Sequence, residues 1–450
     1  MNKRIAILGA GESGVGAALL AQAKGYDVFV SDKGAISEKY RAELTKAGID
    51  FEEGDHTLDK IYATHEIIKS PGIPNTTPVI KGALEKGIPV ISEIEFAGRY
   101  TDGKFICITG TNGKTTTTLL IYHLLKSAGL KVALAGNVGE SLAGKVLNGG
   151  YDYYVVELSS FQLDNMYQFK AHIGILLNIT PDHLDRYEYQ MEKYAAAKFR
   201  LAQNMTASEY LLFNQDDALI QEYKANHEVS GTPVPFGLKN ENGLALRYED
   251  QSILASFSGI SAKVDTSKSP LIGQHNQYNS MAAVGAALLV GLTPEQIDEG
   301  LSTFQNAEHR MQPVGEVDGV KFINDSKATN VEAVWYALDG IKQPIVWVVG
   351  GKDKGNDYST LLPLVKEKVK AIVALGVDNA KIVTAFSPVC PQLVETQDVN
   401  EAVRMAKGFA EAGDVVLLSP ACASFDLFNN YEHRGRAFAE AVQKLKSAGI

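Results

Sequence analysis

The chain has 450 residues, which at about 100–200 residues per domain predicts two to four domains. Its composition is that of a soluble globular protein, with 45% hydrophobic and 21% charged residues, and its net charge of −10 disfavours a general nucleic-acid binder, because such proteins present a basic face. Three scattered cysteines are too few for a disulfide framework, and no apolar run reaches the roughly 18 residues of a membrane span, so we expect a cytoplasmic protein.

Short apolar runs alternate with helical patterns along the chain, and this alternation predicts parallel sheets with crossover helices. The runs divide into three sections, residues 1–93, 94–299 and 300–450, which we expect to be three domains of an α/β protein. The predicted strands are 4–10, 27–31, 66–70 and 88–92, then 105–110, 132–136, 153–159 and 173–180, then 345–351, 371–376 and 414–420. Alternation and turns at 231–270 indicate a small antiparallel excursion.

A glycine-rich turn, "GAGESG", follows the first predicted strand and precedes a helical pattern. Gly9, Gly11 and Gly14 form G-x-G-x-x-G, which lets a diphosphate approach the backbone at a helix N-terminus. Asp32 ends the next predicted strand, where a ribose-binding carboxylate would lie. The motif is compatible with a nicotinamide dehydrogenase, with another diphosphate nucleotide such as a UDP-sugar, or with a tight turn that binds nothing. No hydride-transfer residues stand nearby, and "SPGIP" at 70–74 supplies a second turn at the same sheet edge.

A second glycine loop, "GTNGKTTTT" at 110–118, has only two residues between its glycines. The context of strand, loop and helix is that of a phosphate-binding loop, in which Lys114 can meet terminal phosphates and Thr115 can ligate magnesium. Four consecutive threonines are not the residues that helix propensity favours. This section is therefore expected to bind ATP or GTP, and the guanine-reading sequences of a switch GTPase are missing.

Three downstream residues suit a metal site. Glu157 ends a predicted buried strand, and Mg²⁺ prefers oxygen ligands. His183 follows another predicted strand in "NITPDHLDRY", and Lys198 lies in the helical pattern "YAAAKFRLAQ". Taken singly, such a histidine is more often structural, and such a lysine is more often a solvated helix residue.

The motifs "GTNGKTT", "ELSSFQL", "TPDHLDRY" and "YAAAKFR" together resemble the Mur ligase family, the ATP-dependent amide-forming enzymes of peptidoglycan precursor synthesis. Folylpolyglutamate synthetases share the short loop but lack the first glycine-rich domain. "ELSSFQL", "NDSKATN" (324–330) and "SPACASFD" (419–426) are similar to the members that add D-glutamate, whereas the "DNPR" element of the diaminopimelate- or lysine-adding members is absent. The resemblance spans all three sections and implies a Rossmann-like N-terminal domain, a central P-loop-type ATPase domain and a Rossmann-like C-terminal domain.

The resemblance also implies a role for each matching residue. Lys198 would be carbamylated, and would complete a site for two magnesium ions with Thr115, Glu157 and His183; Lys114, His183 and Lys198 would be catalytic. ATP would contact Gly110, Thr111, Asn112, Gly113, Lys114, Thr115, Thr116, Asn276, Asn279, Arg310 and Asp325, in a cleft between the second and third sections. The UDP-linked substrate would contact Ser13, Asp32, Ser70, Gly72, Asn137 and Ser159. D-Glutamate would contact Thr329, Lys354, Ser424 and Tyr431, although Ser424 could instead cap a helix.

The implied activity is a ligase reaction on three substrates, ATP, UDP-N-acetylmuramoyl-L-alanine and D-glutamate. ATP would phosphorylate the alanyl carboxylate, and the amine of D-glutamate would attack the acyl phosphate. We expect a monomer with no nucleic-acid or membrane partner. The alternatives are another amide ligase of the Mur or folylpolyglutamate type, an NAD(P)-dependent dehydrogenase, or a UDP-sugar sensor without activity. Lys33 and Gly34 depart from the hydroxyl and arginine that some relatives place after Asp32 to hold the uridine, and Tyr431 and Gln312 replace a familiar phenylalanine and glutamate.

Overall fold

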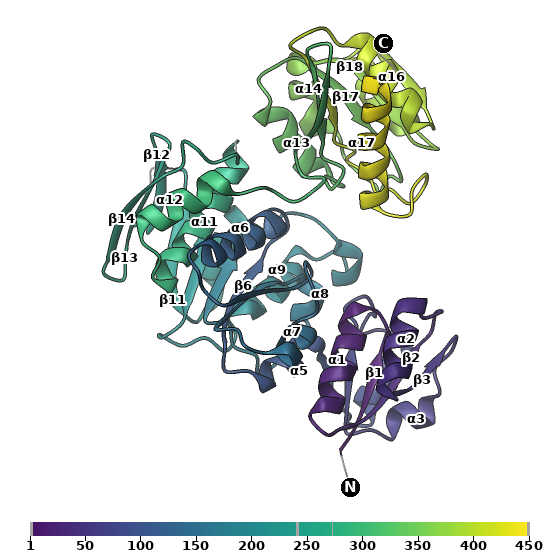
Figure 1. Cartoon of the computed structure of the whole chain (residues 1–450), viewed down its shortest axis with the longest axis vertical. Helices are drawn as coiled ribbons and strands as arrows, with labels where there is room; N and C mark the ends of the chain where they lie inside the picture. Colours follow the sequence, from purple (N-terminus) through teal and green to yellow (C-terminus); the bar gives the residue numbers. More distant parts are fainter. Residues whose placement is uncertain (1–2, 240–242, 272, 448–450) are drawn as a thin grey trace. The chain divides into compact units, whose positions relative to one another are not determined.

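The computed structural model describes residues 3–239, 243–271 and 273–447, and it forms two compact units. The first unit comprises the chain up to Pro270 with Gln277–Phe304, and the second comprises Leu271–Asn276 with the chain from Gln305 onward. The described residues contain three sheets, two in the first unit and one in the second, each flanked by helices (Figure 1). The predicted α/β fold is confirmed. Within the described ranges, no helix has the length and apolar character needed to cross a membrane.

The first sheet is parallel, with the strand order β3-β2-β1-β4-β5. Its strands are β1 (Arg4–Leu8), β2 (Asp27–Asp32), β3 (Asp50–Glu53), β4 (Glu66–Lys69) and β5 (Val90–Ser92), and its helices are α1 (Glu12–Ala23), α2 (Glu38–Ala47), α3 (Leu58–Tyr62), α4 (Pro78–Glu85) and α5 (Glu93–Ala97). The strand order reverses between β1 and β4, and ligands of open parallel sheets bind at the carboxyl ends of the strands beside such a reversal.

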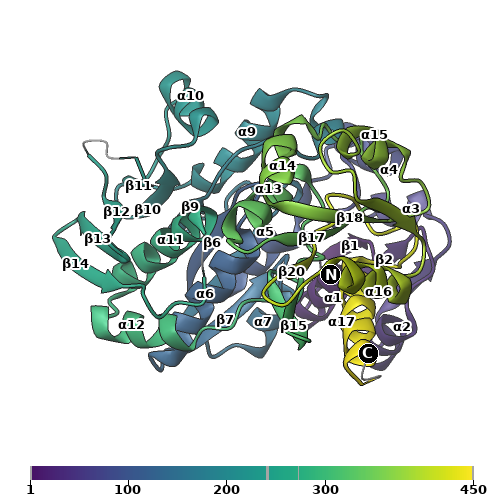
Figure 2. The same ribbon diagram turned by 90° about the horizontal axis from the view of Figure 1, so that it is seen from above.

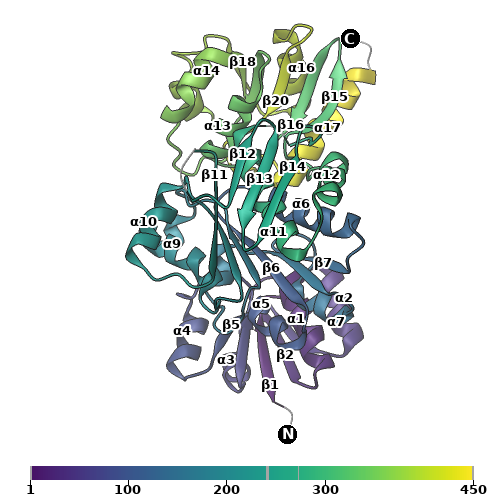
Figure 3. The same cartoon turned by 90° about the vertical axis from the view of Figure 1, so that its left-hand side faces the viewer.

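The second sheet has nine strands in the order β14-β13-β12-β11-β10-β9-β6-β8-β7. They are β6 (Lys104–Thr109), β7 (Val132–Gly136), β8 (Tyr153–Glu157), β9 (Ile173–Leu176), β10 (Tyr210–Asn214), β11 (Thr232–Gly237), β12 (Leu246–Glu249), β13 (Ser252–Phe257) and β14 (Ile260–Asp265). Only β12, β13 and β14 pair antiparallel, at one edge of the sheet, which confirms the predicted excursion (Figure 3). The helices of this part are α6 (Lys114–Ser127), α7 (Leu142–Asn148), α8 (Ser160–Leu163), α9 (Met191–Phe199), α10 (Ala218–Asn226), α11 (Gln274–Val290) and α12 (Pro294–Thr303).

The third sheet has the order β15-β16-β20-β17-β18-β19 and is parallel except for the edge strand β15. Its strands are β15 (Gln312–Val317), β16 (Val320–Asn324), β17 (Ile345–Val349), β18 (Val369–Leu375), β19 (Leu393–Thr396) and β20 (Val415–Leu418), and its helices are α13 (Val331–Gly340), α14 (Leu362–Lys368), α15 (Ala380–Phe386), α16 (Val399–Phe409) and α17 (Tyr431–Ser447). Helices α13 and α14 cover one face and α16 and α17 cover the other (Figure 2). The run "IVWVV" of β17 is consequently buried on both sides, as an apolar run in a parallel sheet should be.

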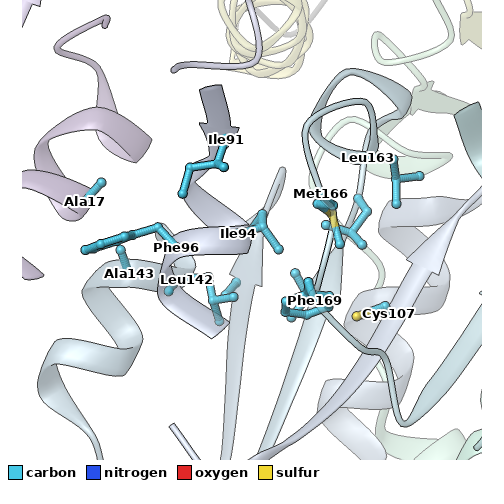
Figure 4. Close-up of a cluster of buried hydrophobic side chains, with 14 of the residues drawn as sticks. Ala17, Ile91, Ile94, Phe96, Cys107, Leu142, Ala143, Leu163, Met166 and Phe169 are labelled. Atoms are coloured by element: carbon cyan, nitrogen blue, oxygen red, sulfur yellow. The ribbon is translucent and has the colours of Figure 1, made fainter. Parts of the chain in front are cut away.

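One apolar core runs through the first unit from the first sheet to the second. It includes Ile7 of β1 and Cys107 of β6. Between them, Phe96 of α5 lies beside Ala143 of α7 (Figure 4). Because burial of apolar surface stabilises a protein by about 25 cal/mol per Å², this continuous core holds the two sheets together as one unit.

Candidate active site

In the first glycine turn, the fold requires glycine at two positions, Gly9 and Gly14, whereas the third position, Gly11, has room for a side chain. Gly9 has a φ of 91°, and a Cβ on Gly14 would lie 1.8 Å from the Gly9 carbonyl oxygen. A Cβ on Gly11 would meet nothing within 4 Å. Packing therefore explains Gly9 and Gly14 but not Gly11, and the open backbone there leads into the first turn of α1, where Ser13 lies.

Asp32 and Ser70 both lie against this turn, at the carboxyl ends of β2 and β4. The Asp32 carboxylate accepts hydrogen bonds from the backbone N–H of Ala10 (2.7 Å) and of Gly34 (2.8 Å). The Ser70 hydroxyl donates to the Gly9 carbonyl (3.4 Å). Asp32 was predicted from the sequence only as a ribose-binding group, and the structure shows that it also holds the glycine turn in place.

The short phosphate loop is closed by an asparagine from the segment after β9. Gly110 and Gly113 have φ values of 151° and 84°, which glycine tolerates best. The Asn178 side-chain oxygen accepts hydrogen bonds from the backbone N–H groups of Thr111 (3.0 Å) and Asn112 (2.8 Å). Sequence reasoning missed Asn178 as a site residue, although it stands in the quoted motif "NITPDHLDRY".

Asn279 lies at the same loop. A Cβ on Gly113 would come within 2.3 Å of the Asn279 side-chain oxygen, and that oxygen accepts a hydrogen bond from the Thr117 hydroxyl (3.2 Å). Thr115 and Thr116, in the first turn of α6, are buried. The structure thus brings Asn279 to the loop from a distant part of the sequence, and its contact with ATP stays a prediction.

Lys114 and Lys198 converge on one backbone carbonyl. The Lys114 ammonium donates to the carbonyl oxygens of Gly110 (2.9 Å) and Thr111 (2.8 Å), and the Lys198 Nζ donates to the same Gly110 oxygen (2.7 Å). Lys198 is only 1% exposed, so it is not a solvated helix residue. Burial, and then the positive charge of Lys114, lower the pKa of Lys198 well below its usual value, which favours a neutral amine.

Glu157 is a buried carboxylate with one oxygen that the protein does not satisfy. It ends β8 and is 1% exposed. Its Oε1 accepts a hydrogen bond from the Asn137 side-chain amide (2.8 Å), whereas no residue in the described ranges donates to Oε2. A buried oxygen of this kind fits a cation as its missing partner. Two residues on, Ser159 caps α8 by accepting from the Gln162 N–H (3.3 Å).

His183 lies in the loop after β9 with a φ of 52° and a half-exposed side chain. Its Nε2 is 3.5 Å from a carboxylate oxygen of Asp182, and its ring meets Phe161 edge to face at 5.2 Å. The described part of the chain contains no group of three or more His, Cys, Asp or Glu side chains arranged to hold a metal. The implied ligand set has only one histidine and one carboxylate, with a hydroxyl and a carbamate as the rest, so it stays a prediction.

In the second unit, Asp325 and Arg310 lie near the ends of β16 and β15. Asp325 accepts hydrogen bonds from the Met311 N–H (3.2 Å) and the Ser419 hydroxyl (2.9 Å), and burial raises its pKa to about 7. The buried Arg310 Nε has no hydrogen-bond partner among the described residues. Burial, and then the charge of Arg310, lower the pKa of His275 to about 4.

The residues predicted for D-glutamate lie on loops that are tied together within the second unit. The Ser326 hydroxyl donates to the Tyr431 carbonyl (2.8 Å), three residues before Thr329. The backbones of Lys352 and Ala423 pair, which joins the loops that carry Lys354 and Ser424. No helix begins at Ser424, so the capping alternative is wrong. Lys354 is exposed and Ser424 is buried.

A buried arginine that was not predicted from the sequence, Arg434, is hydrogen-bonded to these loops. Arg434 is 1% exposed and donates to the backbone carbonyls of Ser326 (2.8 Å) and Cys422 (3.2 Å). Burial lowers its pKa to about 10. It joins the loop after β16 to the loop after β20.

Comparisons with known protein families match three consecutive segments of the chain. Family models fit residues 3–92 (Mur ligase MurD-like, N-terminal domain), 108–287 (Mur ligase middle domain) and 309–422 (Mur ligase, glutamate ligase domain). A UDP-N-acetylmuramoylalanine–D-glutamate ligase from Cytophaga hutchinsonii is 51% identical over 448 residues, 99% of this chain and 100% of the relative. The chain belongs to the Mur ligase family. A protein of the same name from Bacteroides fragilis is 52% identical over 444 residues, 98% of this chain and 100% of the relative.

Solved Mur ligases have the same fold as this member of the family. A pseudomurein peptide ligase type C from Methanothermus fervidus matches with a TM-score of 0.62 and 20% identity, covering 99% of this chain and 100% of that one. A MurF ligase from Thermotoga maritima, solved in complex with ADP, matches with a TM-score of 0.60 and 16% identity over 93% of this chain and 96% of that one. The predicted family and fold are confirmed, and membership of this family argues against the dehydrogenase alternative.

Proposed function

We propose that this Mur ligase uses ATP to join D-glutamate to UDP-N-acetylmuramoyl-L-alanine. The observation that carries the proposal is the 51% identity, over 99% of the chain, to a relative named for that reaction. The site supplies a short phosphate loop, a buried lysine beside it, and an unsatisfied buried carboxylate oxygen. These are groups that phosphoryl transfer to a carboxylate can use.

ATP would bind at the loop of residues 110–116, at the N-terminus of α6. The helix dipole and the N–H groups of its first turn favour phosphates there. Lys114 contacts its own loop carbonyls. It would turn from them to the phosphates and offset their charge. Asn279 would also contact ATP, and Asn276, Arg310 and Asp325 are further proposed ATP contacts.

Lys198 would carry a carbamate. Its buried amine nitrogen would attack the carbon of CO₂, form an N–C bond and lose a proton, which gives an anionic group with two oxygens. Those oxygens, Glu157, His183 and Thr115 would hold two magnesium ions. When bound, the ions would offset the negative charge of the phosphates and of the substrate carboxylate.

The reaction would run in two steps that conserve every atom. A carboxylate oxygen of the alanyl group attacks the γ-phosphorus, and ADP leaves. The amine nitrogen of D-glutamate then attacks the acyl carbon and loses a proton, and phosphate departs with the bridging oxygen. The chain's own residues would orient the two anions and exclude water from the acyl phosphate.

Each predicted domain would bind a different substrate. The first domain, 1–93, would bind the uridine diphosphate through Ser13, Asp32, Ser70 and Gly72. The central domain, 94–299, would bind ATP and, through Asn137 and Ser159, the sugar-peptide. The third domain, 300–450, would bind D-glutamate through Thr329, Lys354, Ser424 and Tyr431. A cationic ammonium and hydroxyl donors suit a dicarboxylate. We also propose a cytoplasmic monomer without a nucleic-acid or membrane partner.

The test is phosphate release from ATP in the presence of UDP-N-acetylmuramoyl-L-alanine and one amino acid at a time. D-Glutamate should stimulate release, whereas L-glutamate, L-lysine and meso-diaminopimelate should not. A Lys114→Ala variant serves as the control for contaminating ATPases and should release none. Equal stimulation by L-glutamate, or stimulation only by a diamino acid, would show that the chain is a different amide ligase.

A further inference from the structure

Arg186 links the two halves of the first unit at the level of the site. It lies in a short 3-10 helix, Leu184–Tyr187, that follows β9, three residues beyond His183. Its guanidinium nitrogens are 3.4 Å from the carbonyl oxygens of Gly72 and of Pro71. Those carbonyls belong to the loop after β4. Arg186, which belongs to the part of the chain that forms the second sheet, therefore contacts the loop of the first sheet that carries Ser70 and Gly72.

Two cations hold three successive carbonyls of this loop. Arg186 contacts residues 71 and 72, and the ammonium of Lys69 donates to the carbonyl of Ile73 (2.9 Å). Lys69 is 2% exposed, and burial, with a smaller contribution from the charge of Arg186, lowers its pKa to about 8. A loop held by fixed donors at each of these carbonyls keeps a defined backbone conformation.

The guanidinium of Arg186 also stacks on an aromatic ring that contacts His183. Its central carbon is 4.2 Å from the centroid of the Phe161 ring, and the same ring meets the His183 imidazole edge to face at 5.2 Å. Phe161 lies in α8, directly after the Glu157–Ser160 segment. Phe161 is therefore in contact with both Arg186 and His183.

We propose that Arg186 is a positioning residue that couples the substrate loop at residues 70–73 to His183 through Phe161. The coupling rests on the proposed function, because it takes the UDP-linked substrate to bind at Ser70 and Gly72 and takes His183 to act in the reaction. A guanidinium suits this task, since its planar fork reaches two carbonyls at once while its face stacks on a ring, whereas an ammonium is a point charge that has neither the fork nor the flat face. Arg186 thus holds the substrate loop in its binding conformation and, through Phe161, keeps the His183 ring in place.

Arg186→Lys tests the coupling, because it keeps the charge and removes the fork and the stacking surface. We expect about a tenfold rise in both the KM and the calorimetric Kd for UDP-N-acetylmuramoyl-L-alanine, and about a tenfold fall in kcat, with the KM for ATP changed less than about twofold. Arg99→Lys is the matched control, because Arg99 also joins elements of the first unit, through a two-pronged contact with Glu66 (2.8 and 3.0 Å). It should leave all of these constants unchanged.

A double-variant cycle separates positioning from a merely structural role. Phe161→Leu alone should lower kcat, and the double variant with Arg186→Lys should be no slower than the slower single variant, since both remove the same link. Multiplied losses in the double variant, wild-type constants in Arg186→Lys, or an equal loss in Arg99→Lys would each overturn the coupling. The calorimetric measurement of substrate binding does not require turnover. It therefore tests the role of Arg186 even if D-glutamate does not stimulate phosphate release and the proposed function is wrong.

Discussion

At the scale of single residues, the candidate site is built from polar groups that the fold buries without fully satisfying. The Lys198 amine shares the Gly110 carbonyl with Lys114, and the Glu157 carboxylate keeps one oxygen without a protein partner. Burying such groups is unfavourable by several kcal/mol unless a ligand or a modification compensates them. Their combination next to a phosphate loop is therefore a mark of function rather than of packing.

Removing the Lys198 amine should abolish the reaction while leaving the fold intact. Lys198→Ala is expected to lower kcat by at least about a hundredfold, because it would remove the proposed carbamate, whose oxygens would hold the metal ions. Lys193→Ala, on the same helix and paired with Glu188, is the control and should retain activity. Carbon-13 NMR of protein equilibrated with labelled CO₂ should show a carbamate signal in the wild type that Lys198→Ala lacks. Full activity of Lys198→Ala would contradict the carbamate role.

The unsatisfied oxygen of Glu157 gives a second expectation. Glu157→Gln removes the negative charge, so the magnesium concentration for half-maximal activity should rise about tenfold or more. In magnesium-free buffer the variant should melt no lower than the wild type, because the unpaired carboxylate is itself unfavourable. Activity titrations with Mg²⁺ and thermal melts with and without the ion measure both effects. An unchanged magnesium requirement would remove Glu157 from the ligand set.

At the scale of elements, the junction of α5 and α7 contains a buried acid that should respond to pH. Glu93, the first residue of α5, accepts a hydrogen bond from the Ala143 N–H (2.5 Å) at the start of α7. Burial, and to a smaller extent the charge of Glu12, raise its pKa from 4.5 to about 7. A raised carboxyl pKa means that the folded protein binds the proton more tightly than the unfolded chain between these two values.

Stability should therefore fall as pH rises from about 5 through 7, by on the order of 3 kcal/mol from this group. Glu93→Gln removes the ionisation, so the variant should be more stable than the wild type at pH 8 and close to it at pH 5. Chemical denaturation at both pH values measures the difference. Glu85→Gln, at an exposed position of α4, is the control and should follow the wild type at each pH. A constant offset between Glu93→Gln and the wild type at both pH values would contradict the assignment.

Most of the apolar strands that are buried on both faces were predictable from the sequence, but the buried run "YLLFN" of β10 was missed, as were polar or interrupted strands. The apolar runs of β1 and β17 can be recognised as buried strands from the sequence alone. The edge strand β3 reads "DFEE" and is half exposed, so it has no apolar signal. Strand β11 contains two prolines, which normally argue against a strand between two neighbours.

At the scale of the whole molecule, the site motifs were predictable because each is a local pattern: the glycine loops and Glu157 lie at the ends of strands, and Lys198 lies in α9. The glycine loops, Glu157 and Lys198 belong to the motifs on which the resemblance to the Mur ligases rests. Asn178 and Arg434 were not predicted, because their role depends on backbone groups 66 and 108 residues away, which no local pattern reveals. The same limit applies to Arg186, whose partners at residues 71 and 72 lie in the first sheet.

The proposed reaction depends on one step, in which ATP phosphorylates the alanyl carboxylate of the nucleotide-linked substrate. UDP-N-acetylmuramoyl-L-alanine labelled with oxygen-18 in both carboxylate oxygens tests this directly, by mass spectrometry of the phosphate released in the presence of D-glutamate. We predict that each phosphate carries one labelled oxygen, since the bridging atom leaves with it. Unlabelled phosphate formed in step with the amide product would contradict the account.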